Sequence, residues 1–305
     1  MENLTGVTEE VNTFFDALAD AGIAPSSPSA LVADGLIHRH HIEGDNPGSL
    51  NGWHVLHLDS PASGAGGSWK AGHSVKWCSK RLSALTASER AEIARRITED
   101  RKRAQEATEA RHKDAAARAL RVWNQSQPAS PAHPYLVRKG VAPGIARQSG
   151  ASLVLPVQDF TGQLWGLQFI QPDGSKRFIS GMAKKGHFIP TGGHPDGNRP
   201  LWIAEGHATA ATIQAMRPNV CTIAACDAGN LLSVATEARK RWPSVSLVVC
   251  PDFDDIGRQK GQEAAEKARA HILPCDKLPA DMPKSCTDWN DWSAWRASQR
   301  QGVAS

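Results

Sequence analysis

Two stretches of the chain, LWIAEGHATAATI at 201–213 and SLVVCPDFDDIG at 246–257, decide its fold. Each begins with a short, nearly continuous apolar run, ends that run at an acidic residue and continues into helix-forming sequence. Between them lies NVCTIAACD at 219–227, which is followed by the helical pattern LLSVATEARKRW at 231–242. Apolar strands that alternate with helices predict an α/β unit with a parallel sheet covered on both faces.

Carboxylates stand at the ends of two of these predicted strands. Glu205 ends the first strand, and Asp252 and Asp254 follow the third. Because the strand-to-helix loops of a parallel sheet open at one edge, the three side chains are expected to gather there. A lone Asp-x-Asp is more often a helix cap or a surface loop, but acids on two such strands favour a site for Mg²⁺ or Mn²⁺.

The chain upstream of this sheet divides into three further parts. Residues 1–82 predict an N-terminal α+β module, with a helix over 9–22 and strands at 36–42 and 53–58. Residues 83–124 are rich in Glu, Arg and Lys at helical spacing and predict a largely solvated connector. Residues 125–199 predict an antiparallel sheet around the Asp-Gly turn of QPDGSK, and 200–305 contain the parallel sheet.

Composition limits the class of protein. The 305 residues have a net charge of +4, so nucleic-acid binding would have to come from local basic patches. No stretch approaches the roughly 20 apolar residues of a membrane span, and the N-terminus lacks the pattern of a signal peptide. The six scattered cysteines read as reduced thiols, so we expect a soluble, cytoplasmic protein with no membrane partner.

Four motifs carry a family resemblance. IAEGHATAATI (203–213), AACDAGNLLSVA (224–235), LVVCPDFDDIGRQKG (247–261) and TDWNDW (287–292) resemble the Toprim domain of plasmid and satellite-phage DNA primases. HPYLVRKGV (133–141) and AKKGHFIPTG (183–192) are more loosely similar to the part that precedes Toprim in these primases. The resemblance implies a Rossmann-like Toprim sheet, preceded by a mixed α+β primase-core subdomain and a small N-terminal β-rich module.

The same resemblance implies roles for the acidic residues. It makes Glu205 a metal ligand or general base, and Asp252 and Asp254 the metal-binding pair of the catalytic site. Asp227 either joins the metal site or is a turn residue. The supporting set, for which helix capping or loop packing is the alternative, is Asp255, Asp288 and Asn290. Phe253 stands where the family often has an acid, which lowers the local charge.

A primase also needs cations for the template strand and the nucleoside triphosphates. The candidates lie in three short clusters on predicted turns or strand edges: Arg138 and Lys139, Lys176 and Arg177, and Lys184 and Lys185. Any one cluster alone could be ordinary solvated loop charge. The resemblance to the primase core favours Lys176 and Arg177.

The N-terminal module is rich in histidine and tryptophan. Its histidines, near Cys78, lack the paired spacing of a zinc site, so zinc is not expected. Trp53, Trp69 and Trp77 lie beside lysines and either stack on a single-stranded template or belong to the core.

The resemblance implies a DNA primase that makes short RNA primers in a bacterial host cell, for plasmid or phage replication. Its partners would be single-stranded DNA, nucleoside triphosphates and a separate helicase, because the chain ends soon after TDWND. The alternatives are a Toprim metal-dependent nuclease and a non-catalytic DNA-binding regulator of replication. A topoisomerase is disfavoured, because the sole tyrosine, Tyr135, lies in the primase-like segment.

Overall fold

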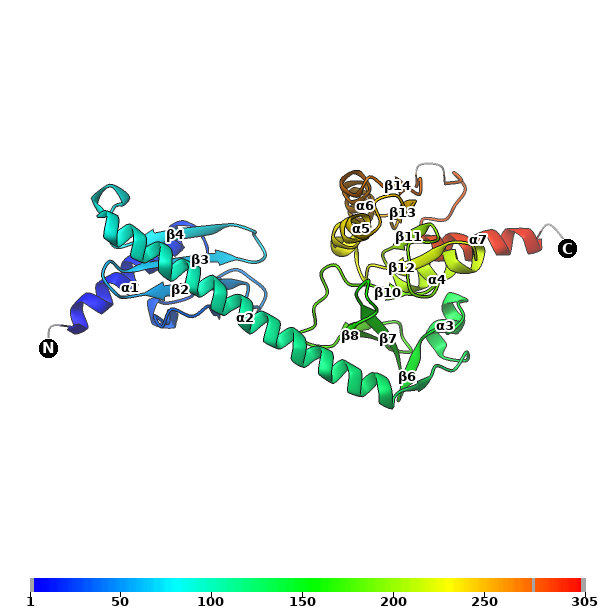
Figure 1. Cartoon of the computed structure of the whole chain (residues 1–305), viewed down its shortest axis with the longest axis horizontal. Helices are drawn as coiled ribbons and strands as arrows, with labels where there is room; N and C mark the ends of the chain where they lie inside the picture. Colours follow the sequence, from blue (N-terminus) through cyan, green and yellow to red (C-terminus); the bar gives the residue numbers. More distant parts are fainter. Residues whose placement is uncertain (1–2, 276–277, 303–305) are drawn as a thin grey trace. The chain divides into compact units, whose positions relative to one another are not determined.

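The computed structural model describes residues 3–275 and 278–302 (Figure 1). The chain divides into two compact units, Met1–Thr108 and Glu109–Ser305, and each is described by itself. The predicted ranges 1–82 and 200–305 include a few residues outside the described part. Among the described residues, no helix is long and apolar enough to cross a membrane.

The first unit is a four-stranded antiparallel sheet with a helix against it. The strands follow one another in the order of the sequence: β1 (His38–His40), β2 (Gly52–His57), β3 (Ser63–Ser68) and β4 (Ser74–Cys78). Helix α1 (Asn3–Asp20) contacts β3 and β4, and two short 3₁₀ turns, η1 (Pro28–Ala30) and η2 (Leu82–Ala84), complete the elements. The predicted helix and strands are therefore present.

The small residues of β3 let α1 approach the sheet closely. A Cβ added at Gly64 would lie 3.1 Å from the ring of Phe14, and one added at Gly66 would lie 2.5 Å from Leu18. Both α1 side chains are fully buried. The glycines of β3 thus serve the packing of the helix on the sheet.

Two buried histidines of this sheet, His40 and His54, are hydrogen-bonded to each other, and the bonds around them require that both rings are neutral. His54 Nε2 accepts from the backbone N–H of Val32, so the proton of its neutral ring is on Nδ1. That Nδ1 lies 3.1 Å from Nδ1 of His40, whose Nε2 lies 2.8 Å from the carbonyl of Ile23 and donates to it. The hydrogen bonds fit two neutral rings, and a proton added to either ring would place two donors face to face.

We predict that the first unit loses stability in mild acid. Burial and the neighbouring His40 lower the pKa of His54 to about 4, from 6.5 in an unfolded chain. The unfolded state therefore binds the proton first, and stability falls as the pH drops from about 6.5 to about 4, by up to roughly 3 kcal/mol. The protection factor of the peptide that covers β2, which corrects for the pH dependence of intrinsic amide exchange, should fall over this range.

The control for this prediction is the replacement of an exposed histidine. His54→Gln should flatten the pH dependence of the β2 protection factor between pH 6.5 and 4, whereas His73→Gln should leave this dependence as in the wild type. A wild-type β2 peptide whose protection is constant over this range would contradict the interpretation.

A single long helix, α2 (Ala87–Gln125), runs from the first unit into the second. It covers most of the range 83–124, where the sequence predicts a helix, and most of it is solvated: its buried residues are Ala115 and Ala119. Those two alanines lie on the part of α2 that belongs to the second unit.

The second unit contains the predicted antiparallel sheet. Its strands also follow the order of the sequence: β5 (Gln127–Pro128), β6 (Arg147–Ser149), β7 (Ser152–Gln158), β8 (Leu164–Ile170) and β9 (Lys176–Phe178). The short helix α3 (Pro134–Lys139) lies between β5 and β6. The turn QPDGSK joins β8 to β9, as the sequence predicts.

The parallel sheet completes the second unit. Its strands have the order β10 (Ile189–Pro190), β12 (Cys221–Ala224), β11 (Leu201–Ala204), β13 (Leu247–Cys250) and β14 (His271–Ile272). All neighbours are parallel except β10, which pairs antiparallel with β12. The helices are α4 (His207–Met216), α5 (Leu231–Arg241), α6 (Asp255–Ala268) and α7 (Trp289–Gly302), with a 3₁₀ turn, η3 (Ala228–Asn230), before α5.

One core cluster joins the two sheets of the second unit. It includes Leu153, Leu155 and Val157 of the antiparallel sheet together with Ala204 and Cys250 of the parallel sheet. Residues from β9 can therefore reach the strand ends of the parallel sheet, where the carboxylates lie.

Candidate metal centre

Glu205 and Asp252 follow the ends of two adjacent parallel strands. β11 and β13 pair in a register that places Ala204 opposite Cys250, so the residues after them leave the sheet at the same edge. Glu205 is only 8% exposed, and its Oε1 accepts a hydrogen bond of 3.0 Å from the backbone N–H of Asp252. The predicted convergence of these two residues is thus present in the fold.

Asp254 lies at the start of α6, where it is the N-cap. Its Oδ1 accepts a 2.6 Å hydrogen bond from the backbone N–H of Gly257. Gly257 in turn lies against Glu205, because a Cβ added to this glycine would stand 2.7 Å from Glu205 Oε1 and 3.2 Å from Asp254 Oδ1. The absence of a side chain at 257 therefore lets two of the three acids approach each other.

The carboxylates oppose one another electrostatically. Burial, together with the negative charges of Glu205, Asp288 and Asp254, raises the pKa of Asp252 to about 8, while Lys176 opposes the shift. The pKa of Glu205 is raised by burial and by Asp254, Asp227 and Asp288, although the amide of Asp252 lowers it. Acidic side chains in this relation favour either protons or a cation between them.

The donor set fits a divalent ion of the Mg²⁺ type. Asp252 Oδ1 is buried and has no hydrogen-bond partner, and all the candidate ligands offer carboxylate oxygen, which Mg²⁺ prefers. Over residues 3–275 and 278–302, no three His, Cys, Asp or Glu side chains already stand in a metal-binding arrangement. Glu205 and Asp254 each use one carboxylate oxygen on a backbone amide, which leaves the second oxygen of each for an ion.

Two further acids lie near this site. Asp227 caps η3, accepts from the amide of Asn230 and pairs with the ammonium of Lys184. Asp288 accepts from the amide of Asp291 at the start of α7, and its Oδ2 is 3.8 Å from Lys139 Nζ. Both charges raise the pKa of Glu205, which places them within electrostatic reach of the centre.

The other two supporting residues lie differently. Asp255 points to solvent and pairs with Arg258 on its own helix, so the structure does not bring it to the centre. Asn290 is buried, and its Nδ2 donates to the carbonyl of Lys139 and to Thr212 Oγ1. Asn290 therefore ties α7 to α4 and to the end of α3.

Phe253 packs away from the carboxylates, into the core. It is 7% exposed, and its ring meets that of Trp289 edge-on at 5.0 Å. Its amide donates to the carbonyl of Thr287, which anchors the Asp-x-Asp segment to the residues before α7.

Lys176 is the basic candidate that lies beside the turn after Glu205. Its Nζ is 3.8 Å from the position that a Cβ at Gly206 would take, directly after Glu205. The residue as a whole is exposed, but burial of its ammonium lowers its pKa, while the charge of Asp252 raises it. Lys176 thus places a positive charge beside the carboxylates.

The other five basic candidates have different partners. Lys139 pairs with Asp291 at 2.9 Å, and Lys184 pairs with Asp227. The remaining three are more peripheral: Arg138 donates to the carbonyl of Pro172, Arg177 lies over the ring of Phe169, and Lys185 is exposed.

Sequence reasoning missed two residues of this region, His207 and Gly257. His207 is buried beside Lys176, and burial lowers its pKa to about 4. A sequence signal did exist for Gly257, because it lies three residues after Asp254. The side chain of a helix N-cap accepts a hydrogen bond from the backbone N–H at that position. Nothing in the sequence singled out His207 from its apolar neighbours.

Known proteins are similar in sequence to the part of the chain that contains this centre. A family model for the Toprim domain matches residues 200–298. Two Escherichia coli proteins named DNA primase TraC are related to the chain: one is 34% identical over 301 residues and the other 33% identical over 276 residues. These alignments include 90% and 85% of this chain, which spans only 20% and 26% of the two relatives.

A solved structure shows a weaker likeness. The primase fragment of the bacteriophage T7 primase-helicase protein aligns with 55% of this chain and 72% of its own, at 15% identity and a TM-score of 0.39. A score of this size does not establish a common fold, so the sequence relatives carry the comparison.

Proposed function

Residues 200–298 form a Toprim domain, and from this premise we propose that the chain is a DNA primase that makes short RNA primers by metal-dependent nucleotidyl transfer. The observation that carries the proposal is the pairing of Glu205 and Asp252 at one strand edge with Lys176 beside them. The relationship to DNA primase TraC over most of this chain supports it.

Each residue of the centre has a part in this chemistry. We assign Glu205, Asp252 and Asp254 as the ligands, with Asp227 at the edge of the set. A divalent ion held there would neutralise phosphate charge and lower the pKa of an attacking hydroxyl. Glu205, whose pKa is raised by burial, is also suited to accept the proton of that hydroxyl.

The basic residues would hold the triphosphate and the template. Lys176 is placed to meet phosphate oxygens next to the carboxylates. Lys184 and Lys139 pair with Asp227 and Asp291, so they would have to exchange these partners for phosphate. Arg138, Arg177 and Lys185 lie at more exposed positions, where they are suited to the backbone of single-stranded DNA.

Tyr135 makes a topoisomerase reaction a poor fit. It is the only tyrosine of the chain and is 2% exposed. Burial and the charge of Asp288 raise its pKa to about 12, which suppresses the phenolate that would attack DNA. The same site could still activate water, so a metal-dependent nuclease is the enzymatic alternative.

One incubation distinguishes the alternatives. The protein is mixed with single-stranded DNA, ribonucleoside triphosphates and Mg²⁺ or Mn²⁺, with either the DNA or the nucleotides labelled. A primase gives new oligoribonucleotides, a nuclease gives shortened DNA, and a binding regulator gives neither product while retaining the DNA. Unwinding ahead of the primase would fall to a separate helicase.

We propose that the first unit contributes to template binding through one face of its sheet. The ring of Trp53 packs closely against Gly67 and lies 5.8 Å from that of Trp69, and Trp69 is 60% exposed. Arg39 pairs with Trp53 across β1 and β2, and Lys76 is an exposed cation on β4. Exposed aromatic rings with nearby cations suit unpaired bases and their phosphates.

Trp77 has a different place. Its ring is 5.5 Å from Phe14 and it packs with the core of this unit, so it takes the core role that the sequence left open.

Trp69→Ala should weaken single-stranded DNA binding by about 5- to 100-fold, since a base stacked on an aromatic side chain contributes roughly 1–3 kcal/mol. Fluorescence anisotropy of a labelled oligonucleotide measures this. Leu50→Ala, which removes another exposed apolar side chain of this unit, should bind like the wild type. Equal affinities for all three proteins would exclude Trp69 as a template contact.

A further inference from the structure

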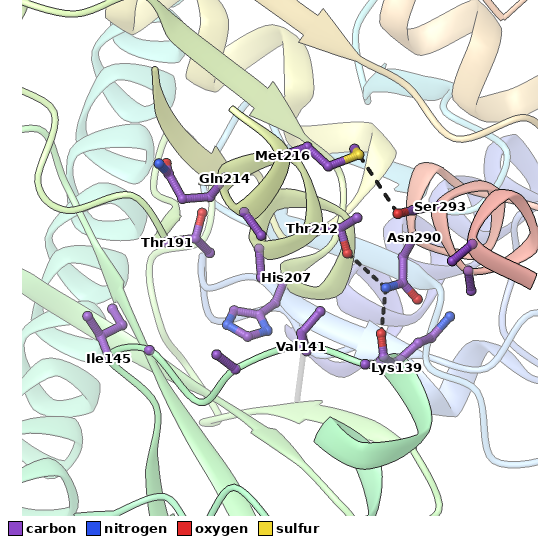
Figure 2. Close-up of a pocket in the computed structure, with 17 residues that line it drawn as sticks. Lys139, Val141, Ile145, Thr191, His207, Thr212, Gln214, Met216, Asn290 and Ser293 are labelled. Carbon is purple, nitrogen blue, oxygen red and sulfur yellow. Dashed lines mark hydrogen bonds between the residues drawn. The ribbon is translucent and has the colours of Figure 1, made fainter. Parts of the chain in front are cut away.

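A pocket of about 540 Å³ lies beside α4, in the second unit. It is lined by α4, by α7 and by the segment from Lys139 to Ile145 that follows α3 (Figure 2). Its size is that of sites that hold small organic ligands, which span roughly 300–1,000 Å³.

Small side chains line much of the pocket. Glycine and alanine residues from three segments contribute only backbone and methyl groups, which leaves a broad apolar space between them. These residues are Gly140, Ala142, Gly144, Ala211, Ala215 and Ala297. Val141, Ile145 and Met216 add larger apolar surface. A flat ring can lie against such walls without displacing them.

The ring of His207 lies among these residues. Figure 2 shows it between the chain segment that carries Val141 and Ile145 and the side chain of Thr191. His207 is only 3% exposed, yet its Nδ1 has no hydrogen-bond partner. A buried nitrogen without a partner is unfavourable, so a ligand that hydrogen-bonds to this ring would satisfy it.

The polar groups around the ring are already engaged. Asn290 Nδ2 donates to Thr212 and to the carbonyl of Lys139, and Thr191 is hydrogen-bonded to Thr222. The ammonium of Lys139 is 2.9 Å from Asp291. Because this one cation is paired, the pocket is poorly suited to a triphosphate and better suited to a neutral ring with a hydrogen-bonding edge.

We propose that this pocket binds a nucleobase, with the base against the small residues of α4 and α7 and its edge on the imidazole of His207. The base would belong either to a free nucleoside or nucleoside monophosphate, or to an unstacked nucleotide of a single strand. The site goes beyond primer synthesis, because it differs from the carboxylate centre in its residues and in the absence of unpaired charge. Because His207 lies two residues after Glu205, a base bound to its ring would contact the turn that presents the Glu205 carboxylate.

Binding of nucleosides in the absence of divalent metal tests the proposal. Adenosine, guanosine, cytidine and uridine, and separately a short single-stranded oligonucleotide, are titrated calorimetrically into the full chain. We expect saturable binding in at least one arm, with one site per chain. A nucleoside that binds identifies a free ligand, whereas oligonucleotide binding that Ala297→Trp weakens, without binding of any nucleoside, identifies a base of the strand.

Variants locate the binding. Ala297→Trp fills the rim from an exposed helix position and should reduce the affinity at least tenfold, as should His207→Phe, which removes the hydrogen-bonding nitrogens. Ser298→Trp, on the same helix but outside the lining, is the matched control for the added indole and should bind like the wild type. Circular dichroism checks that each variant is folded.

Two results would overturn the proposal: no binding in either arm, or binding that folded Ala297→Trp leaves unchanged. A chain that makes no primers but binds a nucleobase in this way would retain the pocket assignment and reject only the primase proposal. The converse result, primers without base binding, would reject the pocket alone.

Discussion

Asp252→Asn and Glu205→Gln should each reduce primer synthesis by at least about 10²–10³-fold, the loss seen when one charge-stabilising group leaves an active site. Each substitution keeps the size of the side chain but removes a carboxylate from the centre where Asp252 Oδ1 lacks a partner. The measurement is the yield of labelled oligoribonucleotide on single-stranded DNA. Calorimetric titration of Mn²⁺ should show weaker metal binding by both variants.

The stability of Asp252→Asn separates loss of function from loss of fold. The pKa of Asp252 is raised to about 8 in the folded protein, against an ordinary value of 3.8. The folded state therefore disfavours the ionised form, and without metal the wild type loses stability as the pH rises from about 4 to 8. Asp252→Asn should consequently melt higher than the metal-free wild type, with the difference larger at pH 8 than at pH 5.

Asp255→Asn is the matched control. It removes a neighbouring carboxylate that is exposed and pairs only with Arg258, so primer synthesis should stay within about twofold of the wild type. If Asp255→Asn fails as badly as Asp252→Asn, or if Asp252→Asn retains full activity, the assignment of the ligands is wrong.

Lys176→Ala should reduce primer synthesis by about 10²-fold, because a preorganised positive charge near the transferred phosphate is lost. Its ammonium is the one that the fold places beside Gly206 and the charge of Asp252. We expect both a higher KM for nucleoside triphosphates and a lower kcat, measured by initial rates at varied nucleotide concentration. Lys176→Arg keeps the charge and should recover part of the activity.

Lys185→Ala is the comparison for Lys176→Ala. Both changes remove one positive charge, but Lys185 is exposed, whereas the ammonium of Lys176 lies beside Gly206. We expect Lys185→Ala to weaken DNA binding and its dependence on salt concentration, and to leave kcat unchanged. Equal losses of kcat in the two variants would mean that overall charge, and not position, controls the reaction.

Several features of the site could be predicted because they depend on local pattern. A short apolar run followed by an acid and a helix fixes the end of a strand, and parallel strands present such ends at one edge. This reasoning located Glu205 and Asp252 and the sheet that contains them. The antiparallel sheet followed in the same way from alternation and the Asp-Gly turn.

Asp254 and Asp255 show what the local sequence pattern does not predict, which is the direction of each side chain. Adjacent in the sequence, they differ in the fold because the first turn of α6 directs one to cap the helix beside Glu205 and the other to solvent. The sequence also suggested that Asn290 takes part in function or in loop packing, whereas the structure shows the contacts it makes to Thr212 and Lys139.

The strand ends, the Toprim motifs and the acids that follow them could be read from the amino-acid sequence, because they depend on spacing along a few neighbouring residues. The folded chain was needed to show that Lys176, from the edge of a separate sheet, reaches Gly206, and that His207 faces a pocket between α4, α7 and the end of α3. Such contacts depend on how distant elements pack around a common core, and no local periodicity encodes which side chains will meet there.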